Sequence, residues 1–311
     1  MASGSKKVIY AALATNLAIL TGKVIAAVAT ASSAMLAESF HAAVDTGNSF
    51  LLLVGERRSQ LPPDEVHPFG HGKELYFWSF VVAVSMFAVG GVMSIFEGIR
   101  HLVHPEQINS ANWAYIVLAV SAAFSTVSLV IGLREVNRRK GDQGLLQFIR
   151  RSKDPTVFTV VLEDVGDITG EVTALLAILL STKLHMPYFD GAGSILIGVV
   201  MMSVSGVLAN ESRGLLIGES ADRDQIEKIK KLVADDSAVD HVGQLQTMQL
   251  GPEQVLLNLE VEFHSQGSIE ALEQTIDRIT RKIQKEHPMV KQVYLEATAL
   301  HSDAKEHKKA S

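Results

Sequence analysis

The chain has 311 residues, of which 47% are hydrophobic and 20% are charged, and it contains no cysteine. Its mean hydropathy of +0.21 is high for a soluble protein and indicates insertion into a membrane. The formal net charge of -6 and the lack of a basic stripe interleaved with aromatic residues argue against nucleic-acid binding. Without cysteine, any metal must be held by oxygen or imidazole ligands.

Six apolar runs are long enough to cross a bilayer and predict six transmembrane helices. They cover approximately residues 8–30, 34–54, 75–99, 113–133, 157–181 and 188–208. The N-terminus shows neither a small-residue cleavage site nor an amphipathic leader, so we expect the first run to be retained. Asn16 and Lys23 interrupt that run, and the lysine is tolerable there if it snorkels to an outer face or points into the bundle interior.

Lysine and arginine are concentrated in alternate loops. The loops between the second and third runs and between the fourth and fifth runs carry Arg57, Arg58, Lys73, Arg134, Arg138, Arg139, Lys140, Arg150, Arg151 and Lys153. The other loops carry no such residue or a single one, Arg100 or Lys183. The positive-inside rule therefore predicts a multi-pass membrane protein with both termini in the cytoplasm.

From about residue 213 the composition becomes that of a soluble domain. Residues 223–233 and 268–286 predict amphipathic helices, and residues 242–250, 255–263 and 290–300 predict strands. The second of these strands alternates clearly between apolar and polar residues. We therefore expect a six-helix transmembrane domain over 1–212, a small cytoplasmic α+β domain of metallochaperone-like αββαβ order over 213–300, and a charged, disordered tail over 301–311.

Two of the predicted transmembrane helices each carry a pair of metal-ligating residues. His41 and Asp45 lie on the second, and Glu163 and Asp167 lie on the fifth. The i, i+4 spacing puts both members of a pair on one face, and two such faces can supply four ligands in a tetrahedron. One imidazole and three carboxylates suit zinc, iron(II), cobalt or nickel, and the carboxylate excess leaves manganese open. Mutual neutralisation as packing contacts is the weaker alternative, because charged groups are costly inside a bilayer.

Three further acids share these two helices. Glu38 precedes His41 by about one turn, and Glu171 follows Asp167 by about one turn. Asp164 points about a hundred degrees away from Glu163 on an ideal helix. We therefore predict that Asp164 lies behind the ligands, and that Glu38 and Glu171 are candidates for supporting them or for relaying protons or metal.

The loop between the second and third predicted helices holds a second cluster of possible ligands. Asp64, His67 and His71 could converge on one cation, and Gly70 and Gly72 permit a tight backbone around them. Histidines on a loop are more often solvated than bound to metal, so a solvated loop is an equally good interpretation of the pattern.

Together these features resemble the cation diffusion facilitator family of zinc transporters over about residues 7–299. The resemblance rests on the two ligand pairs, on the His-Pro-Phe-Gly-His-Gly-Lys loop at 67–73 and on the αββαβ segment. Finer motifs at 39–45, 152–155, 162–164 and 188–190 are most similar to the branch that contains the mitochondrial zinc exporter of animals.

The resemblance implies a bacterial plasma-membrane homodimer that is not an enzyme. It implies export of Zn²⁺, with manganese, iron, cobalt and cadmium as alternatives, from the cytoplasm in exchange for H⁺ by alternating access. The implied transport site is His41, Asp45, Glu163 and Asp167, and the implied loop site is Asp64, His67 and His71. The C-terminal domain would form the dimer.

Two positions depart from the family pattern. Many zinc carriers of the family have histidine at the position of Glu163, which leaves the metal selectivity open. In the C-terminal domain only His241 falls where the family's ligands lie, while Asn258 and Glu296 stand where metal-binding members often carry histidine. We therefore do not expect a binuclear site formed with His241 and Glu296.

Proton coupling follows from ligand chemistry. Metal ligation needs ionised carboxylates and neutral imidazole, so protons and metal compete for the same groups. Two intramembrane aspartates also define aspartyl intramembrane proteases, in which paired carboxyl groups share a proton. His41 and Glu163 beside these aspartates fit a metal better than that chemistry. A membrane protein that senses metal without transporting it is the other alternative.

Overall fold

The computed structural model describes residues 3–109, 111–140, 144, 153–264 and 268–298. The chain divides into two compact units. The first unit contains Met1–Gln60 and Glu74–Arg213, and the second contains Leu61–Lys73 and Gly214–Ser311. By sequence position, residues 61–73 were expected with the transmembrane helices, whereas their contacts group them with the C-terminal unit. The predicted tail at 301–311 lies outside the described residues.

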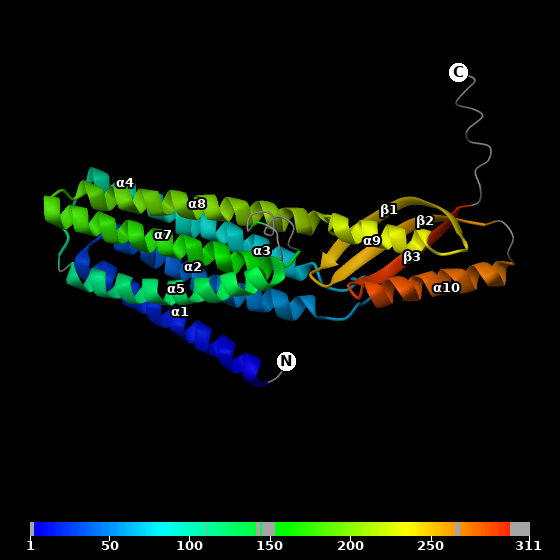
Figure 1. Ribbon diagram of the computed structural model, residues 1–311. Helices are drawn as coiled ribbons and strands as arrows, with labels where there is room; N and C mark the ends of the chain where they lie inside the picture. The colour runs from blue at the N-terminus through cyan, green and yellow to red at the C-terminus, as the bar shows by residue number, and fades with distance from the viewer. Residues whose placement is uncertain (1–2, 110, 141–143, 145–152, 265–267, 299–311) are drawn as a thin grey trace, which may run out of the picture. The chain divides into compact units, whose positions relative to one another are not determined.

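The first unit is built from long helices that run alongside one another (Figure 1). They are α1 (Ser3–Thr30), α2 (Ser33–Ser59), α3 (Glu74–Ser85), the π-helical turn η1 (Met86–Val92), α4 (Met93–Val103), α5 (Asn112–Lys140), α7 (Pro155–Leu184) and α8 (Tyr188–Ile217). Since α3, η1 and α4 form one continuous helical segment, this part of the chain has a helical segment at each of the six predicted apolar runs.

Four of the described helical stretches are long and apolar enough to cross a membrane by length and composition. They are Glu74–Val103, Asn112–Arg138, Thr159–Leu184 and Tyr188–Ile217. Thr15–Thr30 is a shorter apolar helix. The second helix falls outside this set, and it is the one that carries Glu38, His41 and Asp45 within its span.

The N-terminus of α2 is fixed by the first turn of α8. Ser32 caps α2 by accepting a hydrogen bond from the Met35 backbone N–H. Fully buried Asp190 accepts a hydrogen bond of 2.6 Å from the Ser32 hydroxyl and one of 2.5 Å from the Ser33 backbone N–H. A carboxylate is favoured at this position because free N–H groups and the helix dipole point toward it. This contact sets the start of the helix that holds His41 and Asp45.

The second unit contains a three-stranded sheet with two helices. Its elements are α9 (Arg223–Ala234), β1 (Val239–Gly251), β2 (Gln254–Phe263), α10 (Ile269–Glu286) and β3 (Val290–Thr298). The strand order is β1-β2-β3, with β1 antiparallel and β3 parallel to β2.

The core of the second unit follows the alternation of β2. Val255, Leu257, Leu259 and Val261 are buried, as their spacing predicts, and the residues between them are only partly buried. Apolar residues of α9 and α10, including Ile229, Ile279 and Ile283, belong to the same core. Both helices therefore cover one face of the sheet, in agreement with the predicted αββαβ order.

Candidate metal-binding site

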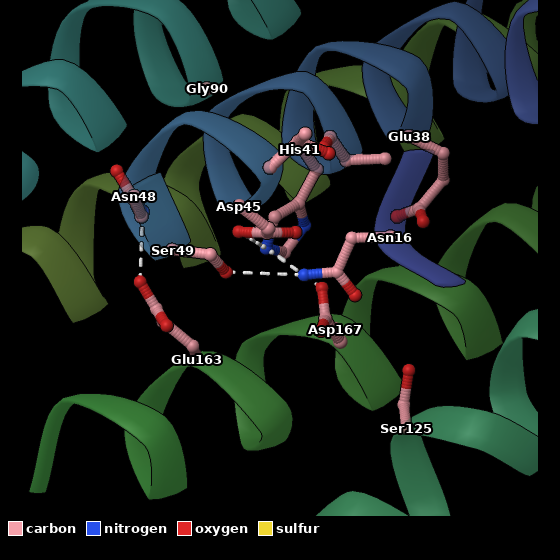
Figure 2. A network of polar contacts seen from close by, with 12 residues as sticks. Asn16, Glu38, His41, Asp45, Asn48, Ser49, Gly90, Ser125, Glu163 and Asp167 are labelled. Carbon is pink, nitrogen blue, oxygen red and sulfur yellow. Dashed lines mark hydrogen bonds and ion pairs between the residues drawn. The ribbon is translucent and has the colours of Figure 1, made fainter. Parts of the chain in front are cut away.

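Three of the four predicted transport-site residues converge between α2 and α7. The ligand atoms of His41, Asp45 and Asp167 all lie within 4.8 Å of one another (Figure 2). His41 Nε2 is 3.1 Å from Asp167 Oδ1 and 3.8 Å from Asp45 Oδ1. The i, i+4 spacing of His41 and Asp45 brings their side chains to one face of α2, where Asp167 meets them from the facing helix.

These ligand atoms are buried without hydrogen-bond partners. His41 is 1% exposed, and the side chains of Asp45 and Asp167 are each 18% exposed. Among the described residues, neither ring nitrogen of His41 has a hydrogen-bond partner of acceptable geometry, and the Oδ1 atoms of Asp45 and Asp167 have none either. Buried polar atoms are normally paired, so this group of atoms calls for a partner. A divalent cation would satisfy the imidazole and both carboxylates at once.

Glu163, the fourth predicted ligand, lies outside this group. Its Oε1 atom accepts a hydrogen bond of 2.8 Å from the Asn48 amide (Figure 2). Asn48 stands three residues after Asp45, so it shares the ligand face of α2. The structure thus brings Glu163 to the edge of the site, where Asn48 is its hydrogen-bond partner.

The acids predicted to lie behind the ligands contact other helices. Asp164 accepts a hydrogen bond of 2.9 Å from the Ser128 hydroxyl of α5. Glu38 and Glu171 both contact the Lys23 ammonium, at 2.7 and 3.3 Å. Of the two positions considered for this lysine, the structure shows the interior one, because Lys23 is only 2% exposed.

Two asparagines beside the site were not singled out as functional by sequence reasoning. Asn48 binds Glu163, and the Asn16 amide donates a hydrogen bond of 3.2 Å to the Ser49 hydroxyl. A signal existed for both. Asn48 follows Asp45 at i+3, and Asn16 precedes Lys23 by seven residues, so each lies on the same helix face as a charged residue within the bundle.

The loop residues also converge, within the second unit. Asp64 Oδ1 lies 3.2 Å from His67 Nδ1, and Asp64 Oδ2 lies 3.4 Å from His71 Nε2. The backbone N–H of His67 donates a hydrogen bond to the Asp64 carboxylate, and this bond holds the pKa of that carboxyl below its ordinary value. Asp64 therefore stays ionised and able to bind a cation, with two imidazoles beside it.

The backbone after this cluster packs against the β1–β2 turn. A Cβ on Gly72 would collide with the carbonyl oxygen of Leu250, and a Cβ on Gly251 would lie 3.2 Å from the Gly72 Cα. Only glycine permits this approach of two backbones. The loop ligands are thereby anchored to the sheet of the second unit.

The two C-terminal candidates lie on different strands. His241 lies on β1 opposite Glu262, and Glu296 lies on β3 opposite Glu260, with β2 between these outer strands. Within the described ranges, neither residue belongs to a cluster of three possible metal ligands.

The comparison with known proteins decides the family. The family model of the cation efflux transmembrane domain matches residues 9–217. The chain belongs to the cation diffusion facilitator family. The predictions of family, of a helical multi-pass membrane protein followed by an α+β segment, and of a transporter family rather than an enzyme family are confirmed.

The relatives are named for different cargoes: one for zinc, one for manganese and one for cations in general. The proton-coupled zinc antiporter SLC30A9 of Xenopus laevis mitochondria is 28% identical over 94% of this chain and 59% of its own length. The manganese efflux system protein MneP of Bacillus subtilis is 24% identical over 79% of this chain and 80% of its own. The cation-efflux pump FieF of Serratia proteamaculans is 28% identical over 83% of this chain and 81% of its own. The chain thus spans 59% of the length of the Xenopus protein.

Proposed function

We propose that the protein is a divalent metal cation/proton antiporter that exports zinc from the cytoplasm by alternating access. The observation that carries the proposal is the convergence of His41, Asp45 and Asp167, whose buried ligand atoms have no hydrogen-bond partner in the part of the chain that the structure describes. A ligand set of this kind, between helices of a membrane domain, suits a transported cation because intramembrane ionisable residues mark ion pathways. The names of the vertebrate relatives favour zinc, and that of MneP makes manganese the second candidate.

In this proposal Glu163 is the fourth ligand. It stands four residues before Asp167 on α7, so a change of rotamer would turn its carboxylate from Asn48 toward the metal. The Asn48 hydrogen bond would then hold Glu163 ready while the site is empty. Three carboxylates and one imidazole bind metal only when deprotonated, so protons arriving from the opposite side would displace it.

We infer the cellular setting from the charge pattern and the family. Arg57, Arg58 and the basic loop after α5 favour a cytoplasmic location for that end of the bundle, which would place both termini in the cytoplasm of a bacterium. The transmembrane domain would occupy residues 1–212, and the αββαβ domain at 213–300 would join two copies into a homodimer. The loop residues Asp64, His67 and His71 would bind a second metal ion.

The test is flux measured in proteoliposomes. Zinc loaded on one side should drive proton movement that a pH-sensitive dye records, and Asp45→Ala or Asp167→Ala should abolish both fluxes. Asp164→Ala is the matched control on α7, because this acid binds Ser128 rather than the ligands. Flux that survives both ligand substitutions would refute the assignment. A wild-type protein that binds zinc but moves neither ion would instead be a metal sensor.

A further inference from the structure

A second polar cluster lies next to the metal site and joins four helices. Its members are Lys23 of α1, Glu38 of α2, Ser121 of α5 and Glu171 of α7. The Lys23 ammonium lies 2.7 Å from Glu38 Oε2 and 3.3 Å from Glu171 Oε1. The Ser121 hydroxyl donates a short hydrogen bond to that same Glu171 oxygen. All four residues are at most 2% exposed, so the cluster is removed from solvent.

This cluster is continuous with the three converging ligands. Glu38 lies one turn before His41 on α2, and Glu171 lies one turn after Asp167 on α7. A Cβ on Gly170 would meet Glu38 Oε1 and would lie 3.6 Å from His41 Nδ1. The absence of a side chain at this glycine lets the Glu38 carboxylate and the His41 ring lie over the same point of α7.

The cluster offers more carboxylate oxygens than the single lysine ammonium can satisfy. Two carboxyl groups face one ammonium, and among the described residues Glu38 Oε1 and Glu171 Oε2 have no hydrogen-bond partner. A buried carboxylate is costly unless its oxygens are satisfied. An ammonium and a divalent cation are both bound by convergent carboxylate and hydroxyl oxygens, and oxygen ligands of this kind suit a hard cation such as Mn²⁺.

We propose that Glu38 and Glu171, the latter held in place by the Ser121 hydroxyl, form a second cation site on the export path, which the Lys23 ammonium fills in the conformation seen here. The inference rests on the proposed function for the direction of transport. A metal that leaves His41, Asp45 and Asp167 toward the far side of the membrane meets Glu38 and Glu171 next. It enters their site by displacing the tethered ammonium, so Lys23 acts as a built-in competitor that keeps this step closed until a metal arrives.

The test counts bound ions in the full chain purified in detergent. Asp64→Ala, His67→Ala and His71→Ala together remove the loop cluster and give the parent protein. Equilibrium dialysis against Mn²⁺ then yields the number of ions per chain. Lys23→Met, which keeps the length and removes the ammonium, should bind one more Mn²⁺ per chain than the parent at concentrations too low for Mn²⁺ to displace the parent's ammonium. Adding Glu38→Gln should abolish this gain. Thr21→Ala on the same helix, whose hydroxyl donates a hydrogen bond to the Leu17 carbonyl, is the control and should leave the count unchanged.

Each outcome bears on the proposal. A monodisperse Lys23→Met protein with the parent's ion count at every Mn²⁺ concentration overturns it. In another outcome, the parent binds no ion at His41, Asp45 and Asp167, whereas Lys23→Met binds one ion. That outcome supports the second site and removes the basis of the proposed function. If Lys23→Met aggregates without metal, Mn²⁺ kept present throughout purification should rescue it, because the ion replaces the missing ammonium. Aggregation with Mn²⁺ as well as without it counts against the second site.

Discussion

His41 Nε2 of α2 lies 3.1 Å from Asp167 Oδ1 of α7, yet the two atoms do not have the geometry of a hydrogen bond. The imidazole and the carboxylate are therefore close enough for an ion pair but are not hydrogen-bonded to each other. Both side chains are directed at one point, which Asp45 also faces. A cation at that point would complete the proposed site, and the residues around it can be changed individually.

Replacement of Asp167 by asparagine should weaken metal binding far more than the same change at Asp164. Asp167 points to the site, whereas Asp164 is hydrogen-bonded to Ser128. Loss of a group hydrogen-bonded to a ligand, which Asp164 is not, typically costs about 10–100-fold in affinity, so loss of the ligand itself should cost at least about 100-fold. Competition with a fluorescent zinc chelator measures both variants. Equal losses at the two positions would show that Asp167 is not a ligand.

Glu163→His should shift the metal preference toward zinc and cadmium, because imidazole is a softer ligand than carboxylate. Parallel flux measurements with zinc, cadmium, manganese, iron(II) and cobalt give the selectivity profile. Asn48→Ala is the control, since it removes the hydrogen bond to Glu163 without adding a ligand. A Glu163→His profile identical to that of the wild type would exclude Glu163 as a selectivity determinant.

Metal binding at the loop cluster should be lost through histidine protonation rather than carboxylate protonation. The hydrogen bond from the His67 backbone keeps the pKa of Asp64 below its ordinary value, so this carboxyl remains charged as the pH falls. His67 and His71 must be neutral to bind metal, so protons compete with the metal for these two imidazoles. Affinity should therefore fall as the pH is lowered while Asp64 is still charged.

Calorimetry at a series of pH values checks the loop prediction. An Asp45→Asn, Asp167→Asn protein isolates the loop cluster from the site between the helices. A His67→Ala, His71→Ala version of the same protein should show no comparable binding at any pH. Binding that persists to the titration range of an ordinary aspartate, near about 3.9, would contradict a role for the imidazoles.

Gly170→Ala and Gly166→Ala should have opposite effects on stability. A Cβ at position 170 would overlap the Glu38 carboxylate, whereas a Cβ at position 166 would lie 3.7 Å from His41 Cε1, an ordinary contact. Overpacking typically costs about 1–3 kcal/mol, while alanine is favoured over glycine inside a helix by about 1 kcal/mol. Thermal unfolding in detergent should place Gly170→Ala below the wild type and Gly166→Ala at or above it. Equal changes in melting temperature for the two variants would mean that the Glu38 side chain moves aside without a measurable cost in stability.

Arg278→Ala should destabilise the second unit at neutral pH and have less effect in acid. Arg278 donates two hydrogen bonds to Asp236, at 2.7 and 3.2 Å, and these bonds hold the pKa of that carboxyl below its ordinary value. A depressed folded-state pKa contributes stability above the unfolded value and loses it as the pH falls through the folded value. Because Arg278 is exposed, the contribution should be about 1 kcal/mol or less.

Hydrogen exchange of β1–β3 peptides during denaturant titration of the full chain gives the free energy of unfolding for this unit. Arg281→Ala is the matched control on α10, since its partner Asp277 is an exposed neighbour on the same helix. If Arg278→Ala lowers the free energy of unfolding by the same amount at every pH, its effect comes from packing instead of charge.

Periodicity predicted much of the fold because each signal is local. The apolar runs predicted the helical segments, and the alternation of Val255, Leu257, Leu259 and Val261 predicted the buried face of β2. The i, i+4 pairs likewise placed His41 with Asp45 on one face of a helix. These features depend only on residues within a few positions of one another.

Contacts between distant segments were harder to predict from the sequence. Lys23 bonds to Glu171, and Asn48 to Glu163, only because the rotation of each helix about its own axis brings these faces together. A polar residue in an apolar run shows that a partner is needed, but the sequence does not say on which helix. The packing of the 61–73 segment against the β1–β2 turn could not be predicted from neighbouring residues. It depends on two glycines, Gly72 and Gly251, that lie far apart in the chain.

The two-unit division affects how truncated chains should be interpreted. The boundary between units is crossed three times, after Gln60, after Lys73 and after Arg213. A chain cut at residue 213 would retain Asp64, His67 and His71 but would remove Leu250 and Gly251, against which Gly72 packs. Deleting the C-terminal region therefore also strips the support from a segment that directly follows the helix bearing His41 and Asp45. Inactivity of such a chain would have at least two possible physical causes, and the loss of the proposed dimer interface would be only one of them.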